Sequence, residues 1–302
     1  MASYDEAIDE YILHLVELAM YSNLLADEVV DMASGRIDEL ADIITQSGNI
    51  RTKRRYKELL SAIDDGQEST RDMVSEKLSS ILDNILALAL PWVGSLVKPI
   101  YKGKVKSPSG MKDKILLATY DSKNSIGDYP SLLSNRIQSL AYGAAKSQYL
   151  FSTHSDIASG YVREGFEPLV SGIRTDIPTI LDSSVRATER LVYDSIDSVK
   201  SLMWVATLDG STCLVCGNRH GKVFDKGKEP MCPAHHRCRC FLIPSKEATN
   251  LVTYQQWISN QSDDTQKKIL GKTRYELYKN GMKLDRFVSD GRKLRLDELE
   301  NR

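Results

Sequence analysis

All five cysteines of this 302-residue chain lie between positions 213 and 240, and the first 212 residues contain none. The stretch from Met1 to Asp9 carries three acidic residues and no basic residue, so we expect no secretory signal peptide. Disulfide bonds are not expected either, because the thiols are odd in number and a reducing cytosol keeps them free. Clustered thiols in such a protein usually bind metal, so this segment is predicted to fold around a metal ion.

The spacing of these residues matches a zinc site. Two cysteines separated by two residues are followed, 18 residues later, by a short stretch rich in His and Cys. Each close pair can hold one ion from a tight turn, and two pairs complete a tetrahedron of thiolate and imidazole ligands. The preferred ligands are Cys213, Cys216, His235 and Cys238. The spacing does not decide between Cys238 and Cys240, or between His235 and His236, as ligands. Cys232 lies outside the paired spacing and is the least favoured ligand.

The predicted zinc ion is structural. A complete set of sulfur-rich ligands is typical of structural sites, whereas a catalytic metal keeps an open coordination position, normally with a carboxylate nearby as base. Asp209 and Asp225 are close in sequence, but Asp209-Gly210 indicates a turn leading into Cys213. No catalytic residue is therefore predicted. Unligated thiols and a catalytic Cys–His pair are the alternatives.

Apolar residues recur at helical spacing over much of the chain, which predicts a mainly α fold. An aromatic content of only 7% also favours long helices over a β-sandwich. Helices are expected at about 4–45, 53–63, 68–90, 131–152, 178–204, 253–260 and 264–280, the third ending at Pro91, which cannot continue the hydrogen-bond ladder. The predicted regions are a long N-terminal helical region (1–97), a basic loop or hinge region (98–130), a central helical region (131–205), a small zinc-stapled α+β module (206–246) and a short C-terminal helical tail (247–302).

The order of several uncommon residues resembles the phage Mu F-like minor head proteins, also called the phage head morphogenesis family. The pattern of that family runs from Arg-x-Thr-Glu through a Trp, Asp-x2-Thr-Cys-x2-Cys and His-Gly to Pro-x-His-x2-Cys-Arg-Cys. The resemblance covers roughly residues 180–299, and Arg237 and Cys232 depart from it, standing where the family commonly has Asn and Pro. The matching residues are Arg186, Thr188, Glu189, Trp204, Asp209, Thr212, Cys213, Cys216, His220, Gly221, Pro233, His235, Cys238, Arg239 and Cys240.

The resemblance implies a minor head (capsid) protein of a tailed phage. Such proteins associate with the portal and act in head morphogenesis and in DNA packaging or ejection. The implied partners are the portal protein, other phage head proteins and packaged double-stranded DNA, and the implied location is the phage head near the portal, after synthesis in the host cytoplasm. No enzymatic activity and no small-molecule substrate are expected. The alternative is a metal-dependent nuclease or DNA-processing enzyme that uses the Cys/His module.

Two basic clusters are candidate DNA contacts, because accessible Lys and Arg side chains are sufficient to bind phosphates. The formal net charge is −1, so contact with nucleic acid must come from local clusters. The candidates are Arg51, Lys53, Arg54 and Arg55 in one cluster and Lys102, Lys104 and Lys106 in the other, although a solvated helix face or loop has the same composition. The apolar stretch 81–97 is interrupted by polar residues and Pro91, which predicts a core helix, and no membrane partner is expected.

Overall fold

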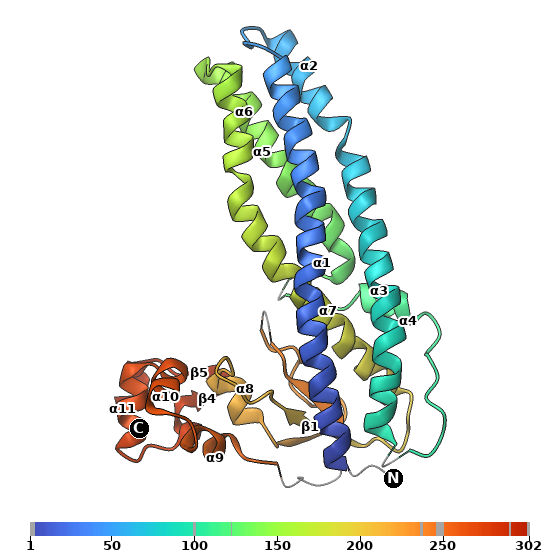
Figure 1. Cartoon of the computed structure of the whole chain (residues 1–302), viewed down its shortest axis with the longest axis vertical. Coiled ribbons are helices and arrows are strands. Elements are labelled where there is room, and N and C mark those ends of the chain that lie inside the picture. The colour runs from blue at the N-terminus through green and yellow to red at the C-terminus, as the bar shows by residue number, and fades with distance from the viewer. Residues whose placement is uncertain are drawn as a thin grey trace. The chain divides into compact units, whose positions relative to one another are not determined.

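The computed structural model describes residues 4–98, 101–121, 123–235, 238–245, 251–289 and 291–300. Helices dominate these residues (Figure 1), so the predicted mainly α fold is confirmed, with few strands and a Cys/His cluster in the C-terminal part. The chain forms two compact units made of separate segments. The helical unit comprises His14–Ala89 and Ser109–Thr188, and the sheet unit comprises Met1–Leu13, Leu90–Pro108 and Glu189–Arg302. Neither unit coincides with one of the five regions expected from the sequence.

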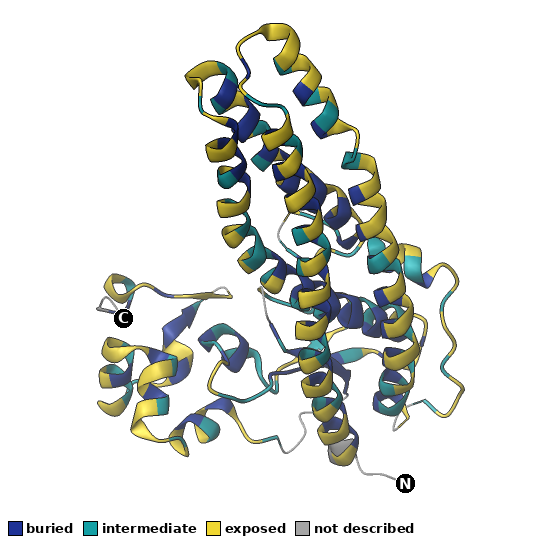
Figure 2. Cartoon of the chain, turned by 45° about the horizontal axis from the view of Figure 1, so that its top comes forward, coloured by how far each residue is buried: buried dark blue, intermediate teal, exposed yellow. Residues whose placement is uncertain are grey.

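Amphipathic helices build the helical unit. α2 (Lys53–Asp64) and α6 (Ser155–Glu164) both pack against α5 (Tyr129–Phe151), and the short α4 (Met111–Leu116) and the 3-10 turn η1 (Ile126–Asp128) also belong to this unit. Most of α1 (Tyr4–Gln46), α3 (Gln67–Val97) and α7 (Phe166–Asp194) completes it. Buried and exposed residues alternate along each helix at helical spacing (Figure 2). The buried apolar side chains include Leu40, Ile44, Ile63, Ile85, Leu133, Ile137 and Ala141.

Polar caps and a left-handed residue set the ends of these helices. The Thr52 side chain accepts a hydrogen bond from the backbone N–H of Arg55 at 3.3 Å, which begins α2. Ser125 and Asp128 form a capping box ahead of α5. Ser152 adopts φ 55° and ends α5. The helices predicted at 4–45, 53–63 and 131–152 are therefore present, each with its ends within two residues of the expected positions.

The helix predicted to end at Pro91 continues to Val97, so that prediction is wrong. Pro91 removes the N–H that would bond to the carbonyl of Ala87, but both residues lie on the exposed side of α3, where water can satisfy the carbonyl. Val93 and Leu96 are fully buried beyond the proline and hold the last turns in place. The segment Lys53–Val97 meets length and hydropathy criteria for a membrane span, a test that core helices also pass.

The helix predicted over 178–204 is also displaced. α7 begins earlier, at Phe166, runs through Pro178 and ends at Asp194, and the stretch Ser201–Val205 is strand β1. The cause is that Leu202 to Val205 are all buried, so this strand has no alternation of apolar and polar residues. From sequence alone, a short continuous apolar run of this kind cannot be distinguished from the end of a buried helix.

The sheet unit is organised around β1. This strand pairs antiparallel with β2 (Val223–Asp225) on one side and with β3 (Phe241–Pro244) on the other, so that Met203 lies opposite both Val223 and Ile243. Tyr11, from the first turns of α1, lies against the ring of Phe241 with the centroids 4.9 Å apart. Its hydroxyl donates a hydrogen bond to the carboxylate of the buried Glu189. The N-terminus thereby belongs to the same core as the sheet.

A second apolar cluster joins the C-terminal elements. These are α8 (Leu214–Arg219), α9 (Tyr254–Ser259), α10 (Asp263–Leu270), α11 (Lys272–Lys279), η2 (Leu284–Phe287), the β4–β5 hairpin (Val288–Ser289, Arg292–Lys293) and α12 (Leu296–Glu300). A single helix was expected over 264–280, but Gly271 adopts φ 78° and separates α10 from α11. The cluster includes Leu214, Tyr254, Ile258, Leu270, Tyr275, Leu284 and Phe287. Since Leu214 follows Cys213 directly, this core reaches the first cysteine pair.

Candidate metal centre

The first cysteine pair lies at the start of α8. Asp209 opens the preceding turn, where its backbone carbonyl accepts from Thr212 N at 3.0 Å and its carboxylate accepts from Ser211 N at 2.8 Å. Cys213 is the N-cap of α8, and its Sγ accepts from the backbone N–H of Cys216 at 3.4 Å. One helical turn therefore presents both sulfurs on the same side.

The second group of ligands precedes β3. The backbone N–H of Cys238 donates to the carbonyl of His235 at 3.0 Å, which forms a second tight turn. Cys240 immediately precedes Phe241, whose pairing with Val205 places this turn at the end of the central strand. β2 follows the first group of ligands and β3 follows the second, and both strands pair with β1. The central strand therefore anchors both groups.

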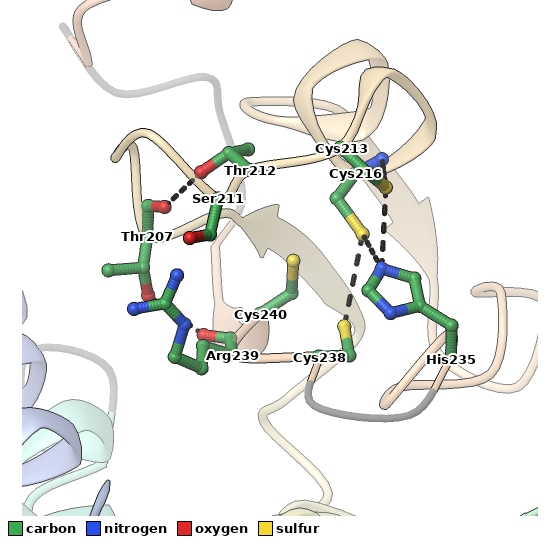
Figure 3. Close-up of a pocket in the computed structure, with 9 residues that line it drawn as sticks. All are labelled: Thr207, Ser211, Thr212, Cys213, Cys216, His235, Cys238, Arg239 and Cys240. Carbon is green, nitrogen blue, oxygen red and sulfur yellow. Dashed lines mark hydrogen bonds between the residues drawn. The ribbon is translucent and has the colours of Figure 1, made fainter. Parts of the chain in front are cut away.

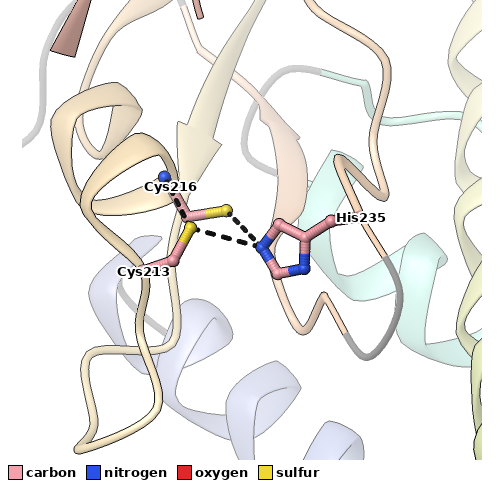
Figure 4. Close-up of side chains that lie close together, drawn as sticks. All are labelled: Cys213, Cys216 and His235. Carbon is pink, nitrogen blue, oxygen red and sulfur yellow. Dashed lines mark hydrogen bonds between the residues drawn. The ribbon is translucent and has the colours of Figure 1, made fainter. Parts of the chain in front are cut away.

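The side chains of Cys213, Cys216, His235 and Cys238 gather in one place, and three of the separations between their ligand atoms suit one metal ion (Figures 3 and 4). His235 Nε2 lies 3.3 Å from Cys213 Sγ and 3.3 Å from Cys216 Sγ, and Cys216 Sγ lies 3.8 Å from Cys238 Sγ. Tetrahedral zinc with bonds of about 2.3 Å to sulfur and 2.0–2.1 Å to nitrogen separates its ligands by about 3.8 Å (S to S) and about 3.6 Å (S to N). The observed separations match these values to within a few tenths of an ångström.

Cys216 is common to two overlapping groups of ligand atoms. One contains Cys213, Cys216 and His235, and the other contains Cys216, Cys238 and Cys240, with the atoms of each group within 4.8 Å of one another. The cluster of five residues can therefore bind a metal ion. The choice between Cys238 and Cys240 stays open in this geometry, because both sulfurs lie within 4.8 Å of Cys216 Sγ, that of Cys238 at 3.8 Å.

The electrostatics of the cluster favour thiolates. The hydrogen bond from Cys216, together with the nearby His235 imidazole, lowers the pKa of Cys213 to about 4. Hydrogen bonds from Cys216 and Cys240 lower the pKa of Cys238 to about 2, whereas hydrogen bonds with the three neighbouring thiols, that of Cys213 first, raise the pKa of Cys216. A thiolate is stabilised by hydrogen bonds from neighbouring thiols, but a second thiolate close to the first is disfavoured by repulsion between like charges. A divalent cation would relieve that conflict by binding all of them as thiolates.

The side chains beside the cluster have structural partners of their own. Arg239 Nη2 donates to the Asp209 carboxylate at 2.7 Å, so the acid that the sequence offered as a base is held in an ion pair. Cys232 belongs to neither ligand group, and its thiol donates to the Cys240 carbonyl at 3.1 Å. Asp225 is exposed and pairs with Lys228. His236, the alternative ligand to His235, lies outside the described residues, as does Arg237.

Sequence reasoning did not foresee the role of His220. Its Nδ1 accepts the backbone N–H of Ala206 at 3.0 Å, which links α8 to the residue that follows β1. Burial lowers the pKa of this imidazole despite a hydrogen bond to the backbone of Val252. The Arg219 guanidinium lies over the Trp204 ring, 5.0 Å from its centroid. Trp204 and His220 are both part of the motif shared with the resembled family, but spacing in the sequence does not predict which residues they contact.

The candidate DNA contacts lie away from the cysteine cluster in sequence and belong to two different units. Arg51, Lys53, Arg54 and Arg55 occupy the start of α2 in the helical unit, and Lys102, Lys104 and Lys106 lie in the stretch between α3 and α4 in the sheet unit. All seven are exposed. Their exposure leaves them free to contact a partner, but does not by itself identify one.

Comparison of the chain with protein-family models, with curated proteins and with solved structures gave no match.

Proposed function

We propose that Cys213, Cys216, His235 and Cys238 bind one structural zinc ion. The observation that carries this proposal is that Cys216 Sγ lies close to both His235 Nε2 and Cys238 Sγ, and Cys213 Sγ close to His235 Nε2, at separations near those of tetrahedral zinc. Three sulfurs and one imidazole are a set that suits zinc, and the Irving–Williams order leaves geometry and ligand type to select the metal. Neither ligand group found among the described residues contains a carboxylate, which supports a structural ion over a catalytic one.

We further propose that the chain is a minor head protein of a tailed phage that acts at the portal in head morphogenesis and in DNA packaging or ejection. The support is the sequence resemblance over roughly residues 180–299, whose cysteine and histidine positions are those of the cluster. The motif residues Arg186, Thr188 and Glu189 are buried, as expected if they serve the fold of the protein. In this role zinc holds the end of the chain in shape, and the portal and other head proteins are the partners.

The rival proposal is a metal-dependent nuclease that uses a histidine of the module as base. It requires a carboxylate beside the metal, and Asp209 is paired with Arg239 while Asp225 is paired with Lys228. These pairings favour the structural role. Incubation of the zinc-loaded protein with duplex DNA should leave the DNA intact, and a cleavage activity lost in His236→Ala with zinc retained would establish the rival.

One measurement tests the zinc site and another tests the head role. Metal analysis of the purified chain should give one zinc per chain. Immunogold labelling or cryo-electron microscopy of particles made with a tagged chain should place the tag at the portal vertex, in few copies. Uniform distribution over the capsid, or absence of the chain from particles, would refute the portal assignment without bearing on the zinc site.

A further inference from the structure

One end of the helical unit combines exposed cations with exposed apolar side chains. It is formed by the α1–α2 connection and the α5–α6 turn, near the labels α2 and α6 in Figure 1, and exposed residues dominate it in Figure 2. We call this surface the basic end. Its members are Arg51, Lys53, Arg54, Arg55, Lys57, Lys146, Leu150 and Phe151, all of them exposed.

Direct contacts join the two segments of the basic end. The rings of Tyr56 and Tyr149 stack, with centroids 4.6 Å apart and an angle of 9° between their planes. The Ser47 hydroxyl donates to the Gln148 side-chain oxygen at 3.4 Å, and the Gln148 amide donates to the Ile44 carbonyl at 3.5 Å. The cations of α2 and the apolar residues at the end of α5 therefore form one surface held in place by a buried glutamine.

The charge of this surface is largely uncompensated. Six cations gather there, in a chain whose formal net charge is −1. Of the six cations, Arg54 has an acidic partner, Glu58 at 3.6 Å, while Asp156 beside the α5–α6 turn pairs with His154 at 3.3 Å. Among the described residues no carboxylate pairs with Arg51, Lys53, Lys57 or Lys146, and α2 has no acid in its first turn. Like charges held this close repel, and an anionic partner would relieve the repulsion.

The residues around the cations indicate the chemistry of that partner. Three of the six cations are arginines, whose planar guanidinium groups bind phosphate with two hydrogen bonds. Leu150 and Phe151 are exposed to 54% and 77%, and Ser152 and Thr153 follow them directly. With Asn49 and Thr52, these small polar groups offer further donors to phosphate oxygens. A membrane surface with anionic headgroups could also bind cations beside exposed Leu and Phe, so vesicles are included in the test below. DNA-binding proteins do combine basic side chains with single apolar wedges.

We propose that the basic end binds the phosphate backbone of double-stranded DNA, with Leu150 and Phe151 in apolar contact with sugars or bases. The inference deepens the proposed head role, because it names the surface that would meet packaged DNA. Of the two basic clusters in the sequence it selects the first, since Lys102, Lys104 and Lys106 lie in a stretch outside any helix or strand.

Fluorescence anisotropy with the full zinc-loaded chain and a labelled 30-base-pair duplex tests the proposal. The variant Arg51→Gln/Lys53→Gln/Arg54→Gln removes three cations and leaves Arg55, which donates to the Ser47 carbonyl at 2.7 Å. Each phosphate contact contributes about 0.9 to the slope of log affinity against log salt. The slope should therefore flatten by about 2.7, so that wild-type affinity falls about 40-fold more than variant affinity between 50 and 200 mM salt.

Matched variants separate a specific surface from bulk charge. Lys102→Gln/Lys104→Gln/Lys106→Gln removes the same charge and should leave the slope within about 0.5 of wild type. Phe151→Ala should weaken binding at every salt concentration without changing the slope, while Leu117→Ala, whose parent side chain is also 77% exposed, should change nothing. If a triple variant does not fold by circular dichroism, single Gln substitutions at the same positions should each lower the slope by about 0.9.

Three results would overturn the proposal. They are no binding of the wild-type chain to duplex DNA at 50 mM salt, an equal loss in both triple variants, and binding to vesicles with anionic lipid headgroups but not to DNA, which would assign the basic end to a membrane. Because the assay uses only purified protein and DNA, its failure would not affect the portal location, and the particle experiments would still test that location.

Discussion

Replacing Cys216 with serine should release the metal, because its sulfur belongs to both groups of ligand atoms. Cys216 Sγ lies 3.3 Å from His235 Nε2 and 3.8 Å from Cys238 Sγ, so no other single change removes as many neighbour contacts. Structural zinc binds with about 10–16 kcal/mol at pH 7. If this free energy is shared equally among four ligands, the loss of one costs about 2.5–4 kcal/mol, which lowers the zinc affinity by roughly two to three orders of magnitude.

The affinity can be measured by competition with a chromophoric chelator, and the metal content by mass spectrometry after gel filtration. Cys232→Ser is the matched control, since Cys232 is half-buried, belongs to neither ligand group and donates to the Cys240 carbonyl, which a hydroxyl can also do. Its zinc affinity should stay within about tenfold of wild type, the effect expected for residues outside the ligand set.

The same assay decides between the two remaining cysteines. Cys238→Ser should behave as Cys216→Ser does, and Cys240→Ser should behave as the control. The reverse pattern would exchange these two ligands and keep the site. Retention of wild-type zinc affinity by Cys216→Ser would refute the reasoning altogether, because no tetrahedral arrangement of the observed side chains omits this sulfur.

Three further predictions concern the fold around the site. Tyr11→Phe removes the hydrogen bond to the buried Glu189 and should lower the free energy of unfolding by about 1.5–3 kcal/mol in urea denaturation, the range for bonds to charged groups; an unchanged midpoint would contradict it. Burial lowers the pKa of His220, so on acidification the unfolded chain binds this proton before the folded chain does. The free energy of unfolding should therefore fall as the pH drops below about 6.5. His220→Asn should reduce that fall, and a variant with the same pH dependence as wild type would refute the assignment. Pro91→Ala restores a backbone donor in α3 and should stabilise the chain by up to about 3 kcal/mol in the same assay, whereas destabilisation would show that Pro91 has a packing role.

The sequence was sufficient to predict the elements that obey local rules. The long helices α1, α2 and α5 carry apolar stripes and end at caps or left-handed residues, so periodicity and capping locate them. The cysteine cluster was predictable for a related reason, since two tight turns with ligand spacing need little information from the rest of the fold.

Other features depend on contacts that spacing does not contain. β1 is buried on both faces, so its sequence lacks the alternation of a strand and was predicted as helix. α3 was predicted to end at Pro91, but packing of the residues beyond it keeps the helix going to Val97. α6 carries small polar residues such as Ser155 and Ser159 on its buried face, which weakens the apolar stripe. The assembly of two units from alternating segments is set by tertiary packing, and no local composition marks its boundaries.

The pairing of Val205 with Phe241 means that the ends of the metal-binding segment are brought together by backbone hydrogen bonds of the sheet. Pairing of β1 with β3 closes the loop between Val205 and Phe241, so most of its closure entropy is lost when the sheet forms. A bound ion then has to close only the shorter stretch from Cys216 to His235. Metal binding and sheet formation are accordingly separable events. We therefore expect the metal-free chain to keep β1 paired with β2 and β3, and to bind the proposed zinc ion as a folded protein.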